Sequence, residues 1–238
     1  MSEDWSLPTA SDADETNPGY PHWDGIAPLP NQRMMFHVGA PSTENFLVVG
    51  DAWGQLVAME LTSGARVLDI GCGCGRTART LLHNPHISEY VGIDVILPYI
   101  DWNTRYLSPL TGGRFRFAHL DVHSAHYNPE GILAPDAAEF PLADASMTLA
   151  FAASLFTHLE EAAAKRYLDE SRRVLRGGGK LIVSIHIEPN DGTDYQGNES
   201  RADVNPVYFA AMASAAGFAV GRRIGDVCGQ ETWLLLAT

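Results

Sequence analysis

The feature that most constrains this chain is a run of alternating glycines directly after an apolar segment. Residues 67–70 are apolar except for Asp69, and they lead into Gly71, Gly73 and Gly75. This order is typical of a buried parallel strand that ends in a turn whose backbone passes close to a ligand. Glycine suits such a turn because it tolerates positive φ and places no side chain between backbone and ligand. The run therefore predicts a ligand-binding turn at the end of a strand.

The spacing of the glycines separates two kinds of nucleotide-binding turn. A dinucleotide fingerprint, G-x-G-x-x-G, would need glycine at position 76, where this chain has Arg76. The observed form, D-x-G-x-G-x-G from Asp69 to Gly75, resembles the cofactor loop of class I S-adenosylmethionine-dependent methyltransferases. An NAD-dependent dehydrogenase stays open as a less favoured alternative.

Length and composition indicate a soluble globular enzyme. The chain has 238 residues, of which 45% are hydrophobic and 19% charged, which suits one domain with a substantial core. The formal charge of −13 disfavours nucleic acid as a partner, because nucleic-acid binding usually needs a basic surface. No apolar run approaches the ~20 residues that span a bilayer, and the acidic N-terminus does not resemble a signal peptide. We expect a cytoplasmic protein without a membrane partner.

The three cysteines predict neither a disulfide framework nor a metal site. Cys72 and Cys74 flank Gly73 inside the turn, and Cys228 lies far away in the sequence. A zinc site is disfavoured because the two turn cysteines are separated by one residue and no second cysteine pair is present. We expect no metal.

The N-terminal part of the chain differs in composition from the rest. Residues 1–32 contain six carboxylates and no Lys or Arg, so residues 1–35 are predicted to be a flexible or lid-forming segment. Residues 36–238 are predicted to form the domain proper. It should open with a helix from Ser42 or Thr43 to about Leu61, since a capping residue precedes apolar residues at helical spacing.

Strands and helices then alternate, which predicts an α/β fold with a doubly wound, mostly parallel sheet. Strands are expected near 66–70, 90–94, 114–120, 147–152, 180–186, 220–225 and 232–237, and helices near 76–83, 97–107, 160–176 and 205–216. The three glycines 177–179 are expected to end the third of these helices. The last two strands lack a helix between them and should form an antiparallel hairpin.

This Rossmann-like layout of seven strands is also similar to that of class I methyltransferases over residues 36–238. Three segments, 117–122, 127–131 and 155–159, resemble the bacterial subgroup that acts on small molecules and glycans. The resemblance implies S-adenosyl-L-methionine as the cofactor and a set of binding residues at the carboxyl ends of the strands. These residues are Asp69, Gly71, Cys72, Gly73, Gly75, Asp94, Val95, Asp121, Val122 and Ala153.

Position in the fold gives each carboxylate an expected role and an ordinary alternative. Asp69 would orient the turn or meet the ammonium group of the cofactor, Asp94 would accept hydrogen bonds from both ribose hydroxyls, and Asp121 would accept from the adenine amine. Val122 would pack on the adenine ring. Each of these residues could instead cap a helix or stabilise a turn.

Two histidines are the candidate catalytic bases, because a hydroxyl acceptor needs a group that removes its proton. His158 follows the fourth strand and His186 ends the fifth, so both should lie on the rim that faces the reacting methyl group. His158 could instead be a structural residue of the family. Asp191 and Asp194 lie in a polar loop, 188–204, and could serve as a base or as metal ligands, or could simply be solvated.

The acceptor should enter between the N-terminal segment and the loops 124–141 and 188–204, because long loops at this rim usually carry specificity. Polar and aromatic residues there could bind a sugar or polyol: Tyr127, Asn128, Tyr195, Gln196 and Asn198. Aromatic residues near Phe36 and Trp53 could equally fit a phenolic acceptor. The sequence therefore predicts a methyltransferase acting on a small molecule or glycan, with oxygen as the favoured atom. N-methylation of an amino sugar or small amine, and non-catalytic binding of S-adenosylmethionine, are the alternatives. Oligomeric state is left open.

Overall fold

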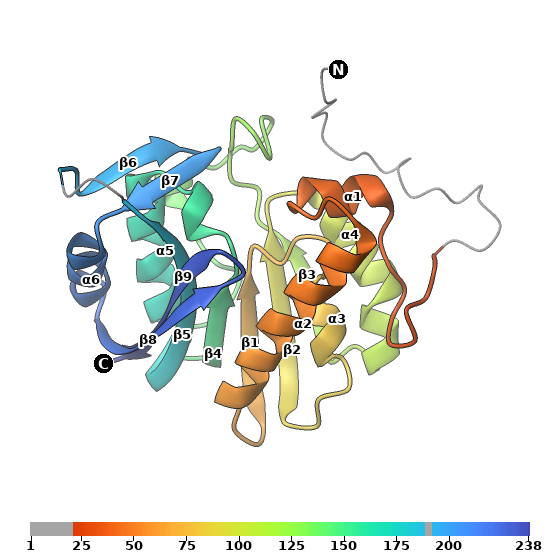
Figure 1. Ribbon diagram of the computed structural model, residues 1–238. Coiled ribbons are helices and arrows are strands. Elements are labelled where there is room, and N and C mark those ends of the chain that lie inside the picture. The colour runs from red at the N-terminus through yellow and green to blue at the C-terminus, as the bar shows by residue number, and fades with distance from the viewer. Residues whose placement is uncertain (1–20, 189–191) are drawn as a thin grey trace, which may run out of the picture.

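A computed structural model describes residues 21–188 and 192–238, and shows one twisted sheet between two layers of helices (Figure 1). Its strands lie in the order β3-β2-β1-β4-β5, with β9 antiparallel beside β5 and β8 antiparallel beside β9. The strands are β1 (Ala65–Ile70), β2 (Ile87–Asp94), β3 (Phe115–His119), β4 (Met147–Ala152), β5 (Leu175–Ile187), β6 (Tyr195–Asn198), β7 (Arg201–Val204), β8 (Phe218–Val227) and β9 (Gln230–Ala237).

The strand predictions are confirmed in type and order, and the parallel sheet with a C-terminal antiparallel hairpin is the predicted fold class. The number of strands was wrong, because the sheet has nine strands where seven were expected. The two additional strands, β6 and β7, form a short hairpin inside the expected polar loop, and β7 continues the sheet beside the last residues of β5, His186 and Ile187. Figure 1 shows this hairpin at the end of the molecule towards which the parallel strands point.

The helices divide between the two faces of the sheet (Figure 1). One face is covered by the N-terminal helices and those that follow β1 and β2, and the other by the two C-terminal helices. The helices are α1 (Gln32–His37), α2 (Thr43–Glu60), α3 (Ala78–Leu81), α4 (Leu97–Tyr106), α5 (Glu161–Val174) and α6 (Pro206–Ala215).

Most helix predictions are confirmed, and three details were wrong. The expected helix at 76–83 is reduced to the single turn α3, because the chain leaves the glycine turn in an irregular path. Helix α1 was not predicted. Helix α5 ends at Val174 rather than at the three glycines, which lie within β5. The cap of α2 is as expected, since the Ser42 side chain accepts a hydrogen bond from the backbone N–H of Asn45.

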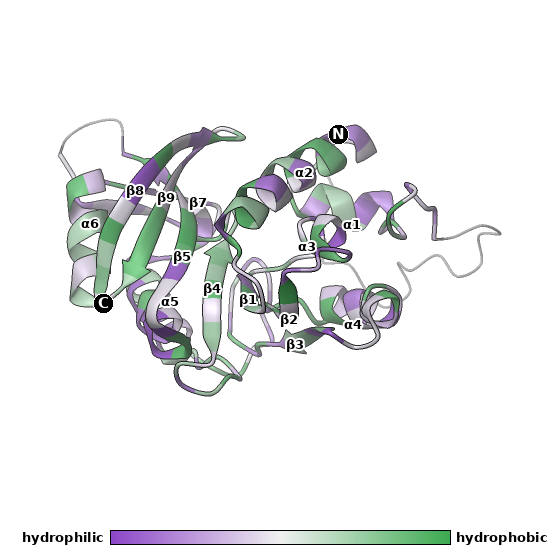
Figure 2. Cartoon of the chain, turned by 90° about the horizontal axis from the view of Figure 1, so that it is seen from below, coloured by the Kyte–Doolittle hydropathy of each residue, from purple (hydrophilic) through white to green (hydrophobic). Residues whose placement is uncertain are grey.

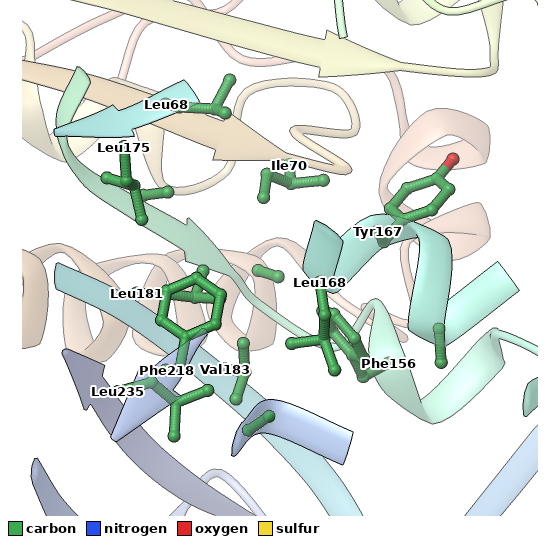
Figure 3. Packing of buried hydrophobic residues seen from close by; sticks show 14 of the residues in the cluster. Leu68, Ile70, Phe156, Tyr167, Leu168, Leu175, Leu181, Val183, Phe218 and Leu235 are labelled. Carbon is green, nitrogen blue, oxygen red and sulfur yellow. The ribbon is translucent and has the colours of Figure 1, made fainter. Parts of the chain in front are cut away.

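Alternate residues of the central strands belong to two separate hydrophobic clusters, one on each face of the sheet. Leu68 and Ile70 of β1 point to the face covered by α5 and α6, whereas Val67 points to the face covered by α1–α4. Figure 3 shows side chains of β1 and β5 in the same cluster as Phe156 and Leu168, while the Tyr167 hydroxyl points away from this cluster. Figure 2 shows the hydrophobic central strands and the more hydrophilic edge strand β8. The alternation has period two, as a strand covered on both faces requires.

The N-terminal segment, as far as the structure describes it, packs against the domain. Met34 and Met35 of α1 are buried in the second cluster. The buried Arg79 guanidinium donates hydrogen bonds to the carboxylates of Asp24 and Asp51, which joins this segment to α2 and α3. The predicted boundary after residue 35 cuts through α1, and residues 1–20 lie outside the described part of the chain. No helix within residues 21–188 or 192–238 has both the length and the hydrophobicity to cross a bilayer.

Close contact between α2 and the segment after the glycine turn depends on two glycines of α2. A Cβ atom at Gly50 would lie 2.6 Å from the Arg76 carbonyl oxygen, and one at Gly54 would lie 1.8 Å from Thr80 Oγ1 and 2.7 Å from its Cβ. The Thr80 hydroxyl is held by the Thr77 carbonyl oxygen at 2.8 Å. Helix α2 therefore fixes the position of the turn on the side away from the sheet.

We expect Gly54→Ala to destabilise the protein by about 1–3 kcal/mol, because the methyl group overpacks the contact with Thr80 and outweighs the better helix propensity of alanine. The measurement is urea unfolding followed by circular dichroism. Gly177→Ala is the matched control, since no atom lies within 4 Å of a Cβ there. Equal stability of the two variants would contradict the packing role of Gly54.

Candidate active site

A cavity of about 700 Å³ opens at the carboxyl ends of β1, β2 and β4, the edge at which α/β sheets bind ligands. Residues after all three strands line it, together with the end of α1 and the turns of the β6–β7 and β8–β9 hairpins. Of the predicted cofactor residues, the cavity is lined by Asp69, Gly71, Cys72, Gly73, Asp94, Val95 and Ala153. The strand ends therefore bring most of the predicted set together.

The three glycines of the turn have the conformation that the sequence indicated. Their φ angles are +73° at Gly71, +53° at Gly73 and +81° at Gly75, a region that residues with a side chain rarely adopt. A Cβ at Gly73 would lie 2.9 Å from Val38 Cγ1. Gly75 does not line the cavity, because it faces Asn103 and Leu107 behind the turn. It permits close packing of α4 against the turn rather than approach to a ligand.

Asp94 connects the glycine turn to the start of α4. One carboxylate oxygen, Oδ2, accepts a hydrogen bond of 2.7 Å from the Gly73 N–H, and Oδ1 accepts one of 2.9 Å from the Ile96 N–H. Burial raises the pKa of Asp94, although these bonds and the neighbouring His119 act in the opposite direction. Each oxygen keeps a second acceptor site, so the carboxylate can bind two ligand hydroxyls while it holds the turn.

Asp69 is almost fully buried and accepts a hydrogen bond from the Tyr90 hydroxyl. Burial raises the pKa of Asp69 to about 7, the Tyr90 hydrogen bond lowers it, and the nearby Asp94 raises it. Tyr90 in turn stacks on Phe115 with ring centroids 4.3 Å apart. The Tyr90 hydrogen bond therefore holds the Asp69 carboxyl group in place. Because its pKa is about 7, a cation beside it would favour the ionised carboxylate near neutral pH.

Three polar residues that sequence reasoning did not select also line the cavity: Arg76, Tyr99 and Gln230. The Arg76 guanidinium donates to the Val38 carbonyl oxygen at 3.0 Å, and among the described residues it forms no ion pair with a carboxylate. Burial lowers its pKa. The Tyr99 hydroxyl is buried without a hydrogen-bond partner in the described part of the chain. Arg76 directly follows the glycine turn in the sequence, and this position could have identified it as a residue of the ligand site.

Gln230 belongs to a small hydrogen-bond network at the junction of β4, β5 and β9. Its Oε1 accepts hydrogen bonds from the hydroxyls of Ser154, at 3.0 Å, and Ser184, at 2.7 Å. The Ser184 hydroxyl accepts from the Ser154 N–H at 2.8 Å, and Ser154 has a φ of +59°, which is unusual for a residue with a side chain. Because Oε1 already accepts two bonds, the amide nitrogen is the group that Gln230 offers to a ligand.

Asp121 and Val122 lie beside the first cavity rather than in it. Leu120 lines that cavity, while Val122 lines a second one of about 740 Å³. The Asp121 carboxylate accepts a hydrogen bond of 3.2 Å from the Asn128 side chain. The two cavities share the residues Val95, His126, Tyr127, Leu155, His158, Tyr167 and Ser200. The adenine contacts expected for Asp121 and Val122 stay a prediction.

His158 faces both cavities, whereas His186 lines neither. His158 lies in a short 3-10 helix (Phe156–His158), and its Nδ1 is 3.0 Å from the Glu199 carbonyl oxygen. A carbonyl oxygen can only accept, so Nδ1 carries the hydrogen and Nε2 keeps a lone pair in the neutral ring. Burial lowers the pKa of His158. The neutral ring is therefore favoured near pH 7, although hydrogen bonds to the backbone of Glu199 and Ser200 act in the opposite direction.

Only some residues of the predicted acceptor loops line the cavities. Tyr127 lines both and contacts the His158 ring edge-on, and Asn198 lines the second. Asn128 bonds to Asp121, Tyr195 donates to the Leu159 carbonyl oxygen and Gln196 donates to Glu188, so all three have structural partners. Asp194 is exposed, and Asp191 lies outside the described residues. Within residues 21–188 and 192–238, no cluster of His, Cys, Asp and Glu is arranged to hold a metal ion.

Comparison with known families agrees with this arrangement. Residues 68–183, from β1 to β5, match the model of a family described as a methyltransferase domain. Over these residues, just under half of its length, the chain is similar to that methyltransferase family. This family and the fold support S-adenosylmethionine as the cofactor, and the glycine turn and Asp94 stay its predicted binding residues.

Solved structures show the same fold at low sequence identity. An S-adenosylmethionine-dependent methyltransferase from Aquifex aeolicus is 19% identical, with a TM-score of 0.55 over 81% of this chain and 92% of that one. The 1,6-didemethyltoxoflavin N1-methyltransferase of Burkholderia thailandensis is 19% identical, with a TM-score of 0.59 over 86% of this chain and 84% of that one. The [4+2]-cyclase SpnF, 18% identical, reaches 0.58 over 79% and 80%. The fold therefore accommodates more than one reaction.

The raised pKa of Asp69 leads to a prediction about stability. The folded protein holds a proton on Asp69 that the unfolded chain, with a pKa near 3.8, releases. The stabilisation from this proton is complete below about pH 4 and is lost as the pH rises to about 7. We expect Asp69→Asn to become more stable relative to wild type as the pH rises from about 5 to about 7, measured by urea unfolding at several pH values. The exposed Asp101→Asn should show no such trend, and parallel curves for Asp69→Asn and wild type would contradict the assignment.

Proposed function

We propose that this protein transfers a methyl group from S-adenosylmethionine to a small, uncharged molecule, with a hydroxyl oxygen as the favoured acceptor atom. The observation that carries the proposal is the position of His158. Its neutral imidazole opens onto the same cavity as the glycine turn and Asp94. A cofactor site and a candidate base therefore lie in one continuous space.

The residues of the cavity fit the polar groups of the cofactor. Asp94 offers two free acceptor positions for the ribose hydroxyls, and Asp69 can compensate the ammonium group of the methionine part. Arg76 and the amide nitrogen of Gln230 can bind its carboxylate, because the guanidinium lacks an ion pair among the described residues. The unpartnered Tyr99 hydroxyl can bond to the ribose or the base. Each of these polar groups thus has a chemical counterpart in the ligand.

The bound cofactor supplies a methyl group on a positively charged sulfur, which is a good leaving group. The protein must then align the acceptor atom with the methyl group and remove a proton from it. Ala153 at the end of β4 leaves room for close approach, and the His158 Nε2 lone pair can take the proton. His186 is the weaker candidate, because it is separated from both cavities.

The acceptor side of the cavity favours a neutral molecule with hydrogen-bonding and aromatic character. The lining residues Phe36, Tyr127, Leu155, His126, His158 and Ser200 carry no permanent charge. The second cavity adds the carboxylates of Asp136, Glu160 and Glu199, which disfavour an anionic acceptor. A phenol, a heteroaromatic hydroxyl or a sugar hydroxyl matches such a lining. The N1-methyltransferase from Burkholderia thailandensis, named for a heteroaromatic compound, supports the small-molecule class.

Two other functions stay open, and different measurements separate them. An amine acceptor needs less help from a base, so N-methylation should be less sensitive to the loss of His158. A second alternative is a protein that binds the cofactor and does not transfer its methyl group, because the fold is shared with the [4+2]-cyclase SpnF and so does not by itself imply methyl transfer. Formation of S-adenosylhomocysteine with a panel of phenols, sugars and amines distinguishes transfer from binding alone.

Asp94→Ala is expected to weaken S-adenosylhomocysteine binding more than tenfold, or about 1.4 kcal/mol, because the charge-assisted ribose contact is lost. The measurement is calorimetric titration. Asp101→Ala, on the exposed side of α4, is the matched control and should bind as wild type does. Circular dichroism checks that Asp94→Ala is folded. Unchanged affinity in the folded variant would remove Asp94 from the cofactor site.

His158→Gln is expected to lower methyl transfer to a hydroxyl acceptor about 10²-fold or more, as general-base catalysis commonly contributes. Its affinity for S-adenosylhomocysteine should change little. Wild-type activity should fall at low pH with a midpoint below about 6.5, since the His158 pKa lies below that of a solvated imidazole. His186→Gln serves as the comparison. Full activity of His158→Gln together with loss in His186→Gln would transfer the role of base to His186.

A further inference from the structure

We infer that Glu199, at the tip of the β6–β7 hairpin, is a positioning residue that assembles the acceptor wall and holds His158 in its base form. This inference rests on the proposed function. The hairpin lies far in sequence from the two loops it contacts, and its tip meets both of them beside the cavities.

The side chain of Glu199 joins the hairpin to the loop after β3. One carboxylate oxygen, Oε2, accepts hydrogen bonds from the Ser124 hydroxyl at 3.0 Å and from the His126 N–H at 2.9 Å. The Ser124 hydroxyl also accepts a bond of 2.9 Å from the Tyr127 N–H. One carboxylate therefore orders the segment Ser124–Tyr127, and with it the aromatic ring of Tyr127.

The backbone of the same residue orients His158. The Glu199 carbonyl oxygen accepts the hydrogen of His158 Nδ1 at 3.0 Å, which fixes the tautomer and leaves Nε2 as the acceptor nitrogen. The Tyr127 ring contacts His158 edge-on, with centroids 5.9 Å apart and planes at 80°. The His158 ring is thus held from two sides, and Glu199 contributes to both contacts.

Glu199 is partly buried and forms no ion pair with any described Lys or Arg, so a need for charge pairing does not explain its position. Its backbone could orient His158 with any side chain at this position. The carboxylate instead determines whether the tip stays against the loop. Since His158 and Tyr127 line both cavities, release of the tip would open the space in which the acceptor binds.

The titration of His158 in the protein without acceptor tests this inference independently of catalysis. Burial is the main cause of the low pKa of His158, and the titratable groups around it are His126, His186, Tyr127, Tyr167 and Glu199. In Glu199→Ala, the tip should leave His158, which removes burial, the largest cause of the low pKa, together with the backbone hydrogen bonds of Glu199 and Ser200, which raise it. Because burial is the larger effect, the pKa of His158 should rise towards about 6.5, the value of a solvated imidazole. Carbon–proton NMR spectra follow the titration, and the signal lost in His158→Gln identifies His158.

Glu199→Gln keeps an acceptor oxygen in the same place and should lie between wild type and Glu199→Ala. The exposed Glu130→Ala, in the same loop region, is the control and should titrate as wild type. S-adenosylhomocysteine affinity should stay within about twofold in all three variants, because the residues proposed to bind it lie on other elements. A wild-type His158 titration in folded Glu199→Ala would overturn the inference.

Acceptor kinetics then separate this inference from the proposed function. Once an acceptor is found, Glu199→Ala should raise its KM by about tenfold, the size expected for lost charge-assisted hydrogen bonds, and Glu199→Gln should restore part of the loss. The absence of transfer to every acceptor by wild type would count against the proposed function, while the NMR titration would still decide the role of Glu199. An unchanged KM in Glu199→Ala would show that the tip does not form the acceptor wall.

Discussion

The Asp94 carboxylate is the contact on which the geometry of the candidate site depends. It accepts hydrogen bonds from the N–H groups of Gly73 and Ile96, and so ties the glycine turn after β1 to the start of α4 after β2. The Gly73 carbonyl oxygen is held on the other side by the Asn103 side chain at 2.8 Å. A turn that consists largely of glycine has high conformational entropy when unfolded, and these bonds keep it in one conformation. The ligand therefore meets a turn that is already ordered.

The same contact explains why the site is formed by the sheet before any ligand binds. Parallel pairing of β1 with β2 places Asp69 beside Gly92 and Ile70 beside Ile93, which brings Asp94 level with the turn. Helix α2 supports the turn from the opposite side through its glycines. The cofactor half of the cavity thus rests on strand register and close helix packing, both of which are rigid. Its acceptor half depends on loop tips that are joined by a few hydrogen bonds, those of Glu199 with Ser124, His126 and His158.

This division also explains what the sequence could predict. The strands that carry Asp69 and Asp94 are apolar segments followed by glycine or a carboxylate. Such patterns lie within a few consecutive residues, so they can be recognised in the sequence. The β6–β7 hairpin has the polar, glycine-containing composition of a loop. It forms two strands because β5 extends to His186 and Ile187, and β7 pairs with these two residues at the edge of the sheet. Its tip residue Glu199 has no local signal at all. Arg76 and Tyr99 sit in predicted segments, but their direction into the cavity depends on how α1 and α4 pack.

The two candidate histidines show why position along a strand was insufficient to choose a base. His158 follows β4 and His186 lies near the end of β5, at the same rim, and burial lowers the pKa of both. They differ in what their neighbours leave accessible. A carbonyl oxygen occupies Nδ1 of His158 and leaves Nε2 for the cavity, whereas His186 lies beside β7, outside both cavities. A base needs both a free lone pair and access to the acceptor. The hairpin tip contacts His158 beside the cavities, whereas His186 pairs with Asp203 of β7 and lines neither cavity.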